Sequence, residues 1–368
     1  MINQQDAAVK FQRTLELLRD PQASITAEAI YTLSDLAGEQ LQAFQALWTQ
    51  MPLERRRSLI ARLVETLETN FELDFSAITN PALDDPDLEI RLAAIEGVLE
   101  DSPRPVIERL MNLAQDDLHS QVRAAAVRAL GPFVLKGELG KLPPEFNIRL
   151  QDTILALHKN LNEDLDVRRR ALESIGNCGR EGVLELIREA YYADDLPMRV
   201  SAVFAMGRSY DEVWAPQIME ELSSEYPEMR FEATRAAGEL EMRPALPRLT
   251  ELAYEDDREI QEMAIWAMGE IGGKVATRVL NELAALAESS GDDLLADAVA
   301  EALAAASLVD EDVLPLFDFS DLDLDVEDDD LDAIDLYGDS DDDDDDDDGD
   351  GYINLEDAYD FINFDDEY

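Results

Sequence analysis

The stretch MRVSAVFAMG, residues 198–207, decides the fold because copies of it recur along the chain. Each copy has an apolar residue, then an arginine, an alanine three residues after that arginine and a glycine eight residues after it. We call this pattern the cassette. The full copies are VRAAAVRALG (122–131), VRRRALESIG (167–176), MRVSAVFAMG (198–207), MRFEATRAAG (229–238) and IQEMAIWAMG (260–269), the last with glutamine for arginine. An earlier copy, IRLAAIEGVL (90–99), lacks the glycine.

The spacing of the copies indicates a repeat protein. The arginine positions are 91, 123, 168, 199, 230 and 261, so the steps are 32, 45, 31, 31 and 31 residues. A fixed period of this size is the sequence signature of a solenoid. An acidic turn comes before each copy, and another amphipathic run comes before that turn, so one repeat is helix, turn, helix. The sequence therefore predicts an all-α fold, an α-solenoid of stacked helix pairs.

The small residues of the cassette have two expected roles. The alanines recur where a neighbouring helix approaches most closely. The glycines fall at the end of each periodic run, where a left-handed helix cap favours a residue without a Cβ atom. We therefore expect glycines such as Gly207 to be helix caps.

An acidic turn followed by the cassette resembles HEAT repeats, in particular the short phycobilisome-lyase type of about 30 residues. The resemblance is strong from residue 84 to residue 306. It implies a ladder in which turn aspartates pair with the cassette arginines along the stack. The ladder arginines would be Arg91, Arg123, Arg168, Arg199 and Arg230, with partners among Asp87, Asp117, Asp164 and Asp195. The pattern is broken where Glu225 is the acid nearest to Arg230 and where Gln261 replaces arginine.

Composition changes along the chain suggest four segments. Residues 1–80 are predicted to be degenerate helical repeats without the cassette, and residues 81–309 to be HEAT-type repeats. Residues 310–345 are predicted to be a disordered acidic tail, because blocks of like charge repel one another and do not collapse. Residues 346–368 contain a segment that resembles a calcium-binding loop.

The charge of the chain is uneven, and it narrows the choice of partner. The formal net charge is −54, and 29 acidic residues but no lysine or arginine lie in residues 310–368, which leaves −25 for the rest. We do not expect a nucleic-acid partner, because its phosphates and this protein are both negatively charged and would repel each other. We expect a protein or peptide partner that is basic. The first part of the tail mixes aspartate with Leu, Phe, Val and Ile, as segments that dock transiently on a partner do.

The calcium-loop-like segment follows the poly-aspartate run. Carboxylates stand at loop positions 1, 3 and 5, glycine at 6, a backbone carbonyl at 7, asparagine at 9 and aspartate at 12. The candidate calcium ligands are Asp346, Asp348, Asp350, Tyr352, Asn354 and Asp357. This is the order of an EF-hand loop, and the aspartate at position 12 resembles dockerins. The other reading is a coincidence within an acidic tail, so no cofactor is predicted apart from this calcium site.

The sequence offers little for catalysis. His119 and His158 are the only histidines, and neither lies beside a glutamate, so the His-Glu pairs of HEAT-type metal hydroxylases are missing. Cys178, the only cysteine, has no histidine close by in the sequence and is expected to be buried. We predict that the protein is not an enzyme. Lyase activity remains an alternative through the resemblance to bilin lyases alone.

A candidate binding surface comes from the variable cassette positions, one, two and five residues after the arginine. These positions avoid the alanine–glycine pattern and should point away from the core. The candidate partner-binding residues are Arg169, Arg170, Phe204, Phe231, Arg235 and Trp266. Arginine and aromatic residues are typical anchors of protein interfaces. The other reading is that the aromatic members pack against neighbouring repeats.

Two further stretches stand out. The step of 45 residues contains an insertion at residues 135–147, which we expect to form a loop at one edge. Four arginines at 55, 56, 57 and 62 form a basic spot on one predicted helix, for which a solvated face is the preferred reading.

These observations favour a cytoplasmic, non-catalytic scaffold or adaptor that binds a partner protein or peptide along the solenoid. The acidic tail either recruits a basic partner or folds back on the arginines as an inhibitor. One alternative is a bilin-lyase-like or chaperone-like protein acting on a phycobiliprotein or another client, and another is calcium-responsive binding. The single cysteine fits a reducing compartment, the amino terminus lacks an apolar signal-peptide core, and no apolar run predicts a membrane span.

Overall fold

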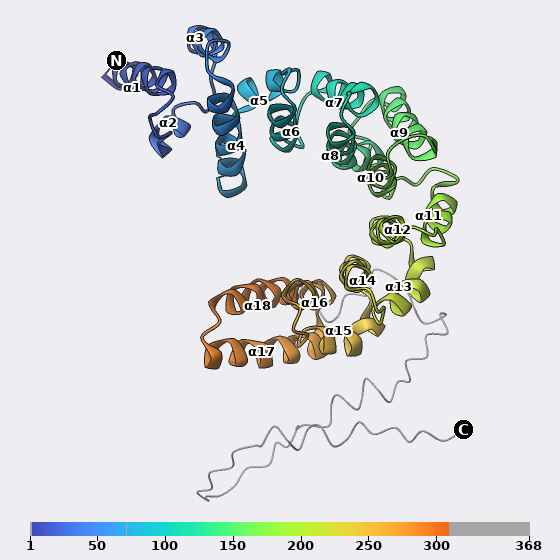
Figure 1. Cartoon of the computed structure of the whole chain (residues 1–368). Helices are drawn as coiled ribbons and strands as arrows, with labels where there is room; N and C mark the ends of the chain where they lie inside the picture. Colours follow the sequence, from blue (N-terminus) through green and yellow to red (C-terminus); the bar gives the residue numbers. More distant parts are fainter. Residues whose placement is uncertain (1, 71, 309–368) are drawn as a thin grey trace, which may run out of the picture. The chain divides into compact units, whose positions relative to one another are not determined.

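The computed structural model describes residues 2–70 and 72–308, and the only regular secondary structure in this part of the chain is helix. It holds eighteen α-helices and two 3₁₀ helices, with no strand (Figure 1). The prediction of an all-α solenoid of stacked helix pairs is therefore confirmed for these residues.

The helices pair as the repeat pattern predicts. Each pair consists of a first helix, a turn and a second helix, and the second helices from α6 to α16 carry the cassette. The first helices are α5 (Ser76–Ala82), α7 (Arg104–Asp116), α9 (Pro144–Lys159), α11 (Val183–Tyr191), α13 (Ala215–Glu221), α15 (Leu246–Leu252) and α17 (Gly273–Ser290). The second helices are α6 (Leu88–Glu96), α8 (Ser120–Glu138), α10 (Leu165–Ile175), α12 (Leu196–Arg208), α14 (Pro227–Glu239), α16 (Arg258–Ile271) and α18 (Asp293–Ala306). The 3₁₀ helices η1 (Glu212–Trp214) and η2 (Arg243–Ala245) lead into α13 and α15.

The amino-terminal residues are helical without the cassette, and α4 belongs to the row of second helices. Residues before α5 form α1 (Ile2–Arg19), α2 (Ala27–Tyr31), α3 (Gly38–Trp48) and α4 (Leu53–Thr69). Helix α4 packs against α6, α6 against α8, and each later second helix packs against the next one. We call this continuous series, from α4 to α18, the second-helix row (Figure 1).

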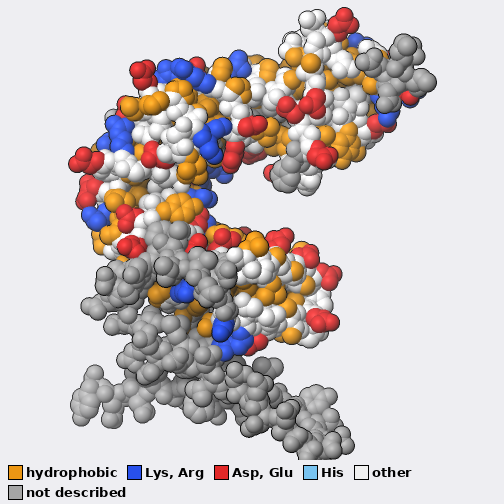
Figure 2. Space-filling model, turned by 180° about the vertical axis from the view of Figure 1, so that it is seen from behind, with side chains coloured by type: hydrophobic (Ala, Val, Ile, Leu, Met, Phe, Trp, Pro, Cys, Tyr) orange, Lys and Arg blue, Asp and Glu red, His pale blue; other side chains and the backbone are white. Residues whose placement is uncertain are grey.

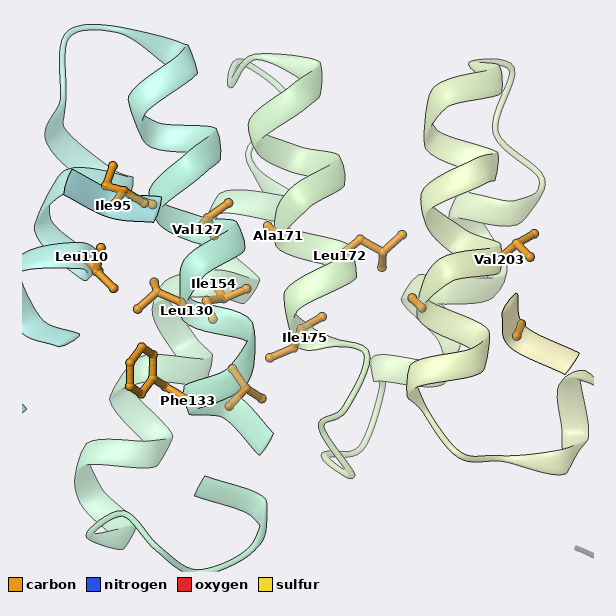
Figure 3. Packing of buried hydrophobic residues seen from close by; sticks show 14 of the residues in the cluster. Ile95, Leu110, Val127, Leu130, Phe133, Ile154, Ala171, Leu172, Ile175 and Val203 are labelled. Atoms are coloured by element: carbon orange, nitrogen blue, oxygen red, sulfur yellow. The ribbon is translucent and has the colours of Figure 1, made fainter. Parts of the chain in front are cut away.

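The core lies between the two rows of helices. Ile95, Leu130 and Leu172 come from successive second helices and Ile154 from α9, and all four are buried (Figure 3). Alanines of the cassette, such as Ala171, are fully buried where the second helices meet. Because one helix pair cannot bury its apolar face alone, each repeat depends on its neighbours.

The prediction that the cassette glycines are left-handed caps is wrong. None of the five has a positive φ; Gly207, Gly238 and Gly269 lie inside helices, and Gly176 has φ −53°. A Cβ atom at Gly238 would lie 2.8 Å from the Ala267 Cα atom, and one at Gly269 would lie 2.9 Å from the Ala302 Cα atom. These glycines are therefore needed because the next second helix comes too close for a side chain.

The insertion at residues 135–147 is mostly helix, so the prediction of a loop there is also wrong. Helix α8 continues to Glu138 and α9 begins at Pro144, which leaves a short connection. Proline at the start of α9 suits a first helical turn, where its missing N–H group is not needed. The extra residues therefore lengthen two helices of the stack.

Candidate functional site

A groove on the second-helix row is the best-formed candidate site. Its volume is about 370 Å³, and it runs across α8, α10 and α12. Arg128, Arg170, Phe204 and Arg208 line it, together with Glu100, Gly131, Pro132, Leu135, Glu173, Ser174 and Asn177. Basic side chains lie beside hydrophobic ones over these middle helices (Figure 2). We call it the arginine groove.

Two polar groups of the arginine groove are unused by the described part of the chain. Arg128 is exposed and makes no hydrogen bond or ion pair with any described residue. The Asn177 Oδ1 atom is buried and also lacks a hydrogen-bond partner there. A buried polar atom without a partner costs free energy, so such atoms are usually satisfied by something. The groove thus offers one guanidinium donor and one amide acceptor to a ligand.

Phe204 forms the apolar part of the groove and is held between two arginines. The Arg235 guanidinium carbon lies 4.0 Å from the ring centroid, and that of Arg208 lies 5.6 Å from it. Arg235 also donates through Nη2 to the Phe204 carbonyl oxygen at 3.0 Å. Cations over an aromatic face are attracted to it, so the orientation of this ring is fixed before any partner arrives.

Arg169 and Arg170 are tied to the buried carboxylate of Glu173. Arg170 Nη1 donates to Glu173 Oε2 at 2.6 Å, and the Ser201 hydroxyl donates to Oε1 at 2.5 Å. Arg169 Nε in turn donates to the Ser201 hydroxyl at 3.1 Å. These bonds connect α10 to α12 and neutralise much of the positive charge that the sequence places here.

Arg235 lies between α12 and α14 and is buried rather than open to a partner. Glu232 accepts a hydrogen bond from its Nε atom at 2.7 Å, and Glu239 lies against its Nη1 atom. Glu239 also pairs with Arg208 at 3.2 Å. Burial raises the pKa of the Glu232 carboxyl, although Arg235 opposes this by attracting the charged form. Arg235 therefore joins two repeats and contacts both the ring and the backbone of Phe204.

The remaining predicted residues lie further along the row. Phe231 on α14 is partly buried against the core. Trp266 on α16 is partly exposed, and its ring covers Gly238, where a Cβ atom would lie 2.8 Å from the Trp266 Cζ3 atom. Of the six predicted residues, the structure brings Arg170 and Phe204 into the groove. Arg169 and Arg235 do not line the groove but contact residues that do.

Sequence reasoning missed Arg128 and Arg208. Arg128 stands five residues after its cassette arginine, the position that Phe204, Arg235 and Trp266 occupy in other repeats, so the same rule could have found it. Arg208 directly follows the cassette glycine, and no feature of the repeat singles it out.

A ladder of arginines exists, with a different choice of acids from the one predicted. Arg91 pairs with Asp117 of the next turn at 2.8 Å, as the resemblance implies. Arg123 pairs with Glu163 at 2.6 Å, Arg199 with Glu221 at 3.4 Å, and Arg230 with Glu255. Asp87 instead pairs with Arg57 of α4 at 2.6 Å. Asp164 caps α10, and neither Asp164 nor Asp195 has an ion pair among the described residues.

Most ladder side chains also bind a backbone carbonyl of their own turn. Arg91 donates to the Asp85 carbonyl, Arg123 to the Asp117 carbonyl and Arg230 to the Ser224 carbonyl, at 2.7–2.9 Å. Arg168 donates to the His158 carbonyl at 3.2 Å and has no carboxylate partner within the described residues. Three ladder arginines, Arg91, Arg123 and Arg230, therefore fasten both their own turn and the next repeat. Arg199 has only the ion pair to the next repeat.

Gln261 keeps the hydrogen bond to a backbone carbonyl, and Arg258 makes the ion pair to the next turn. Its Nε2 atom donates to the Ala253 carbonyl at 3.0 Å. Arg258, one turn earlier on α16, pairs with Asp292 of the next turn at 2.9 Å. The ladder thus continues past the glutamine.

The arginines at 55, 56, 57 and 62 are used inside the protein. Arg55 is buried and donates to the Ala23 and Leu17 carbonyls, and Arg62 donates to the Ile25 carbonyl. Arg56 pairs with Asp85. The reading of this basic spot as a solvated face is therefore wrong for Arg55, which is buried, whereas Arg62 is exposed. All four side chains connect α4 to its neighbours.

The described residues contain no cluster suited to a metal ion. No group of three or more His, Cys, Asp or Glu side chains could hold a metal ion there. Cys178 is buried, as expected, and burial raises the pKa of its thiol. The predicted calcium ligands from Asp346 to Asp357 lie outside the described residues. Among described helices, none combines the length and apolar character that crossing a bilayer requires.

Comparison with known proteins identifies the repeat. Residues 215–304 match the family model of HEAT repeats, so the chain contains HEAT repeats. The matched residues run from α13 to α18 and include two cassettes. The search of curated proteins finds no match for this chain.

Similar solved structures include three proteins of different kinds. Human deoxyhypusine hydroxylase is 16% identical, with 83% of this chain and 99% of that chain covered and a TM-score of 0.33. The CpcE–CpcF complex of phycocyanin lyase from Nostoc sp. is 17% identical, with 62% and 93% covered and a TM-score of 0.42. Importin beta is 14% identical, with 82% and 47% covered and a TM-score of 0.39. At this level of likeness, none of their activities carries over to this chain.

Proposed function

We propose that this protein is a non-catalytic scaffold that holds a partner protein in the arginine groove of its second-helix row. The observation that carries the proposal is the groove itself. Arg128 and Asn177 have no partner among the described residues and flank a phenylalanine ring that is already fixed. Anchoring residues of protein interfaces are typically arginine and aromatic side chains in such preformed depressions.

The groove is suited to a carboxylate or amide side chain beside an apolar one. Its three arginines face two glutamates, and Glu173 is already bound to Arg170 and Ser201. Arg128 is then the free positive charge, and its planar guanidinium can bind a carboxylate through two parallel hydrogen bonds. Phe204 and Leu135 supply apolar contact next to it.

The charge of the whole chain points to a partner that is basic elsewhere. A net charge of −54 attracts a basic protein over long distances and speeds its encounter, whereas the groove acts at contact distance. Of the two roles for the acidic tail, recruitment of the partner is favoured. Arg169, Arg170 and Arg235 are already neutralised by glutamates or aspartate, which leaves Arg128 as the groove arginine open to an inhibitory tail.

A charge reversal tests the proposal. Affinity purification from the native host would use the wild-type chain and the Arg128→Glu variant as baits. Arg243→Glu is the matched control, because Arg243 is also exposed and unpaired within the described residues but lies outside the groove. We expect a partner that the Arg128→Glu bait loses and the Arg243→Glu bait keeps. Identical recovery with all three baits would contradict the proposal.

A further inference from the structure

The turns between first and second helices carry a second regular surface. Five consecutive turns each expose one large apolar side chain, and the first helical turn of α18 exposes a sixth. These residues are Leu118, Leu161, Tyr192, Tyr226, Tyr254 and Leu294. We call them the turn row. Leu118 is 92% exposed, Leu161 78%, and Tyr192 and Leu294 71% each. Single exposed apolar residues are common on protein surfaces, but one in each of six successive repeats forms a stripe.

The turn row lies along one edge of the stack. Second helices pack side by side in chain order, so their first residues line up. Ion pairs join the start of one second helix to an acid that comes before the next second helix: Arg123 with Glu163, Arg199 with Glu221, Arg230 with Glu255 and Arg258 with Asp292. Packed helices are about 8–10 Å apart. Successive members of the turn row are therefore separated by roughly this distance.

Carboxylates without ion pairs surround the turn row. Within the described residues these include Asp116, Asp194, Asp195, Glu225, Asp256 and Asp293. The ladder arginines beneath them are partly buried and already paired with Glu163, Glu221 and Glu255. Lys159, beside Leu161, is an exposed positive charge on this edge. The edge therefore presents apolar side chains in a field of negative charge.

We infer that the turn row binds an extended, basic segment of a partner protein that carries an apolar side chain at about every third residue. Charge complementarity gives the sign of the partner, because lysines or arginines would face the free carboxylates. Spacing gives its conformation. Three residues of polyproline II chain make one turn, cover about 9 Å and return the side chain to the same side, which matches the separation of neighbouring repeats.

A designed peptide tests this inference on the full-length chain. The probe is an 18-residue peptide of six Leu-Lys-Pro units, and its comparison is six Ser-Lys-Pro units of equal charge. Proline favours the polyproline II conformation, which places the leucines on one side. Calorimetry or fluorescence anisotropy at low salt should give about tenfold tighter binding of the leucine peptide, the gain expected from partial burial of a few leucines. The acidic tail carries both charge and apolar residues, so the part of the affinity ratio that comes from the turn row is the part that the variants below remove.

Matched variants locate the effect. Leu118→Ser, Leu161→Ser and Leu294→Ser together should remove most of the leucine preference. The control, Leu139→Ser with Ile148→Ser, also changes exposed apolar residues, but they lie near the α8–α9 connection, and the preference should remain. A second set, Asp116→Asn, Asp194→Asn and Asp256→Asn, should weaken both peptides. Equal affinity for the two peptides, or a preference unchanged by the triple serine variant, would overturn the inference. The arginine groove is intact in all these variants, so its role is tested separately.

Discussion

Gly238 shows at the level of one atom why the cassette has its form. In this position the Ala267 Cα atom of the next second helix leaves no room for a Cβ atom. At Gly131 the space is larger, since a Cβ atom would lie 3.5 Å from the Ser174 Cα atom. The sequence pattern showed that glycine is required, but it did not reveal the reason. Helix ends and close helix contacts both favour glycine, so spacing alone does not separate them.

We therefore expect different effects from two Gly→Ala changes. Gly238→Ala should lower the free energy of unfolding by about 1–2 kcal/mol, because overpacking outweighs the gain in helix propensity. Gly131→Ala should be near neutral, since the propensity gain is offset by the restriction that Pro132 places on the preceding residue. Urea denaturation of both variants checks this. A smaller loss for Gly238→Ala than for Gly131→Ala would show that close approach is not the reason for the cassette glycine.

His158 makes stability depend on pH. Its ring is buried, its Nδ1 atom lies 3.0 Å from the Arg168 carbonyl oxygen, and burial lowers its pKa. A carbonyl only accepts, so the Nδ1–H group must donate to it. Below about pH 6.5, the ordinary pKa of histidine, the unfolded chain binds a proton that the folded chain resists. Stability contributed by the neutral ring is therefore present above this pH and is lost as the pH falls.

The His158→Asn variant tests this effect. Asparagine can keep the donor to the Arg168 carbonyl but does not titrate. Between about pH 7 and pH 5, the range around the ordinary pKa of histidine, the free energy of unfolding should fall more for the wild type than for the variant. Denaturation at several pH values gives the comparison. Parallel stability curves would mean that His158 is not responsible.

At the scale of the helix, the turn ladder decides how repeats are joined. Arg91 is buried with Asp117, and it also binds the Asp85 carbonyl. The family resemblance implied arginine–acid pairs, and the structure gives such pairs for four of the five arginines. The resemblance did not predict the correct acid in most repeats. Turns differ in length and in the position of glutamate or aspartate, and a longer side chain such as Glu163 can reach where Asp164 is occupied in capping a helix.

Arg91→Gln should reproduce the situation of Gln261, which keeps the carbonyl bond without an ion pair. We expect a loss of about 2–3 kcal/mol because Asp117 would remain nearly buried without its partner. Adding Asp117→Asn should recover part of the loss. The control is Arg180→Gln, whose pair with Asp152 is exposed and should contribute less than about 1 kcal/mol. Chemical denaturation measures all four proteins, and equal losses for the two arginines would refute a structural ladder.

The six predicted partner-binding residues illustrate what helical spacing can and cannot predict. Position two after the cassette arginine places Arg170 in the groove, and position five places Phe204 there. Whether such a residue is free depends on the next repeat. Arg235 pairs with Glu232 and Glu239, whereas Arg128 pairs with no carboxylate of the described residues. Charge partners from other repeats decide this, and a single-repeat pattern does not contain them.

For the whole molecule, the fold was predictable because the period repeats six times and every copy points to the same helix pair. The groove was less predictable. It needs the lengthened α8, the side-by-side packing of three second helices and the pairing of Arg170 and Arg208 with glutamates. Each of these follows from contacts between repeats.

Removing residues 310–368 tests the role of charge in the whole chain. The truncated protein loses 29 negative charges, so we expect slower association with the basic partner at low salt. The difference should shrink toward about 1 M salt, where the screening length is about 3 Å. Association rates at several salt concentrations, by surface plasmon resonance, give the answer. Tighter binding of the truncated protein at low salt would instead indicate an inhibitory tail.

Site-specific photocrosslinking tests the central claim, that the arginine groove holds a partner protein, most directly. A photoreactive benzoylphenylalanine would replace Leu135, which lines the groove, or Val213, which is exposed in η1 outside it. The account predicts one protein crosslinked through Leu135 and not through Val213, and its loss when Arg128→Glu is added. The same crosslinked products from both positions, or products at Leu135 that persist with Arg128→Glu, would contradict it.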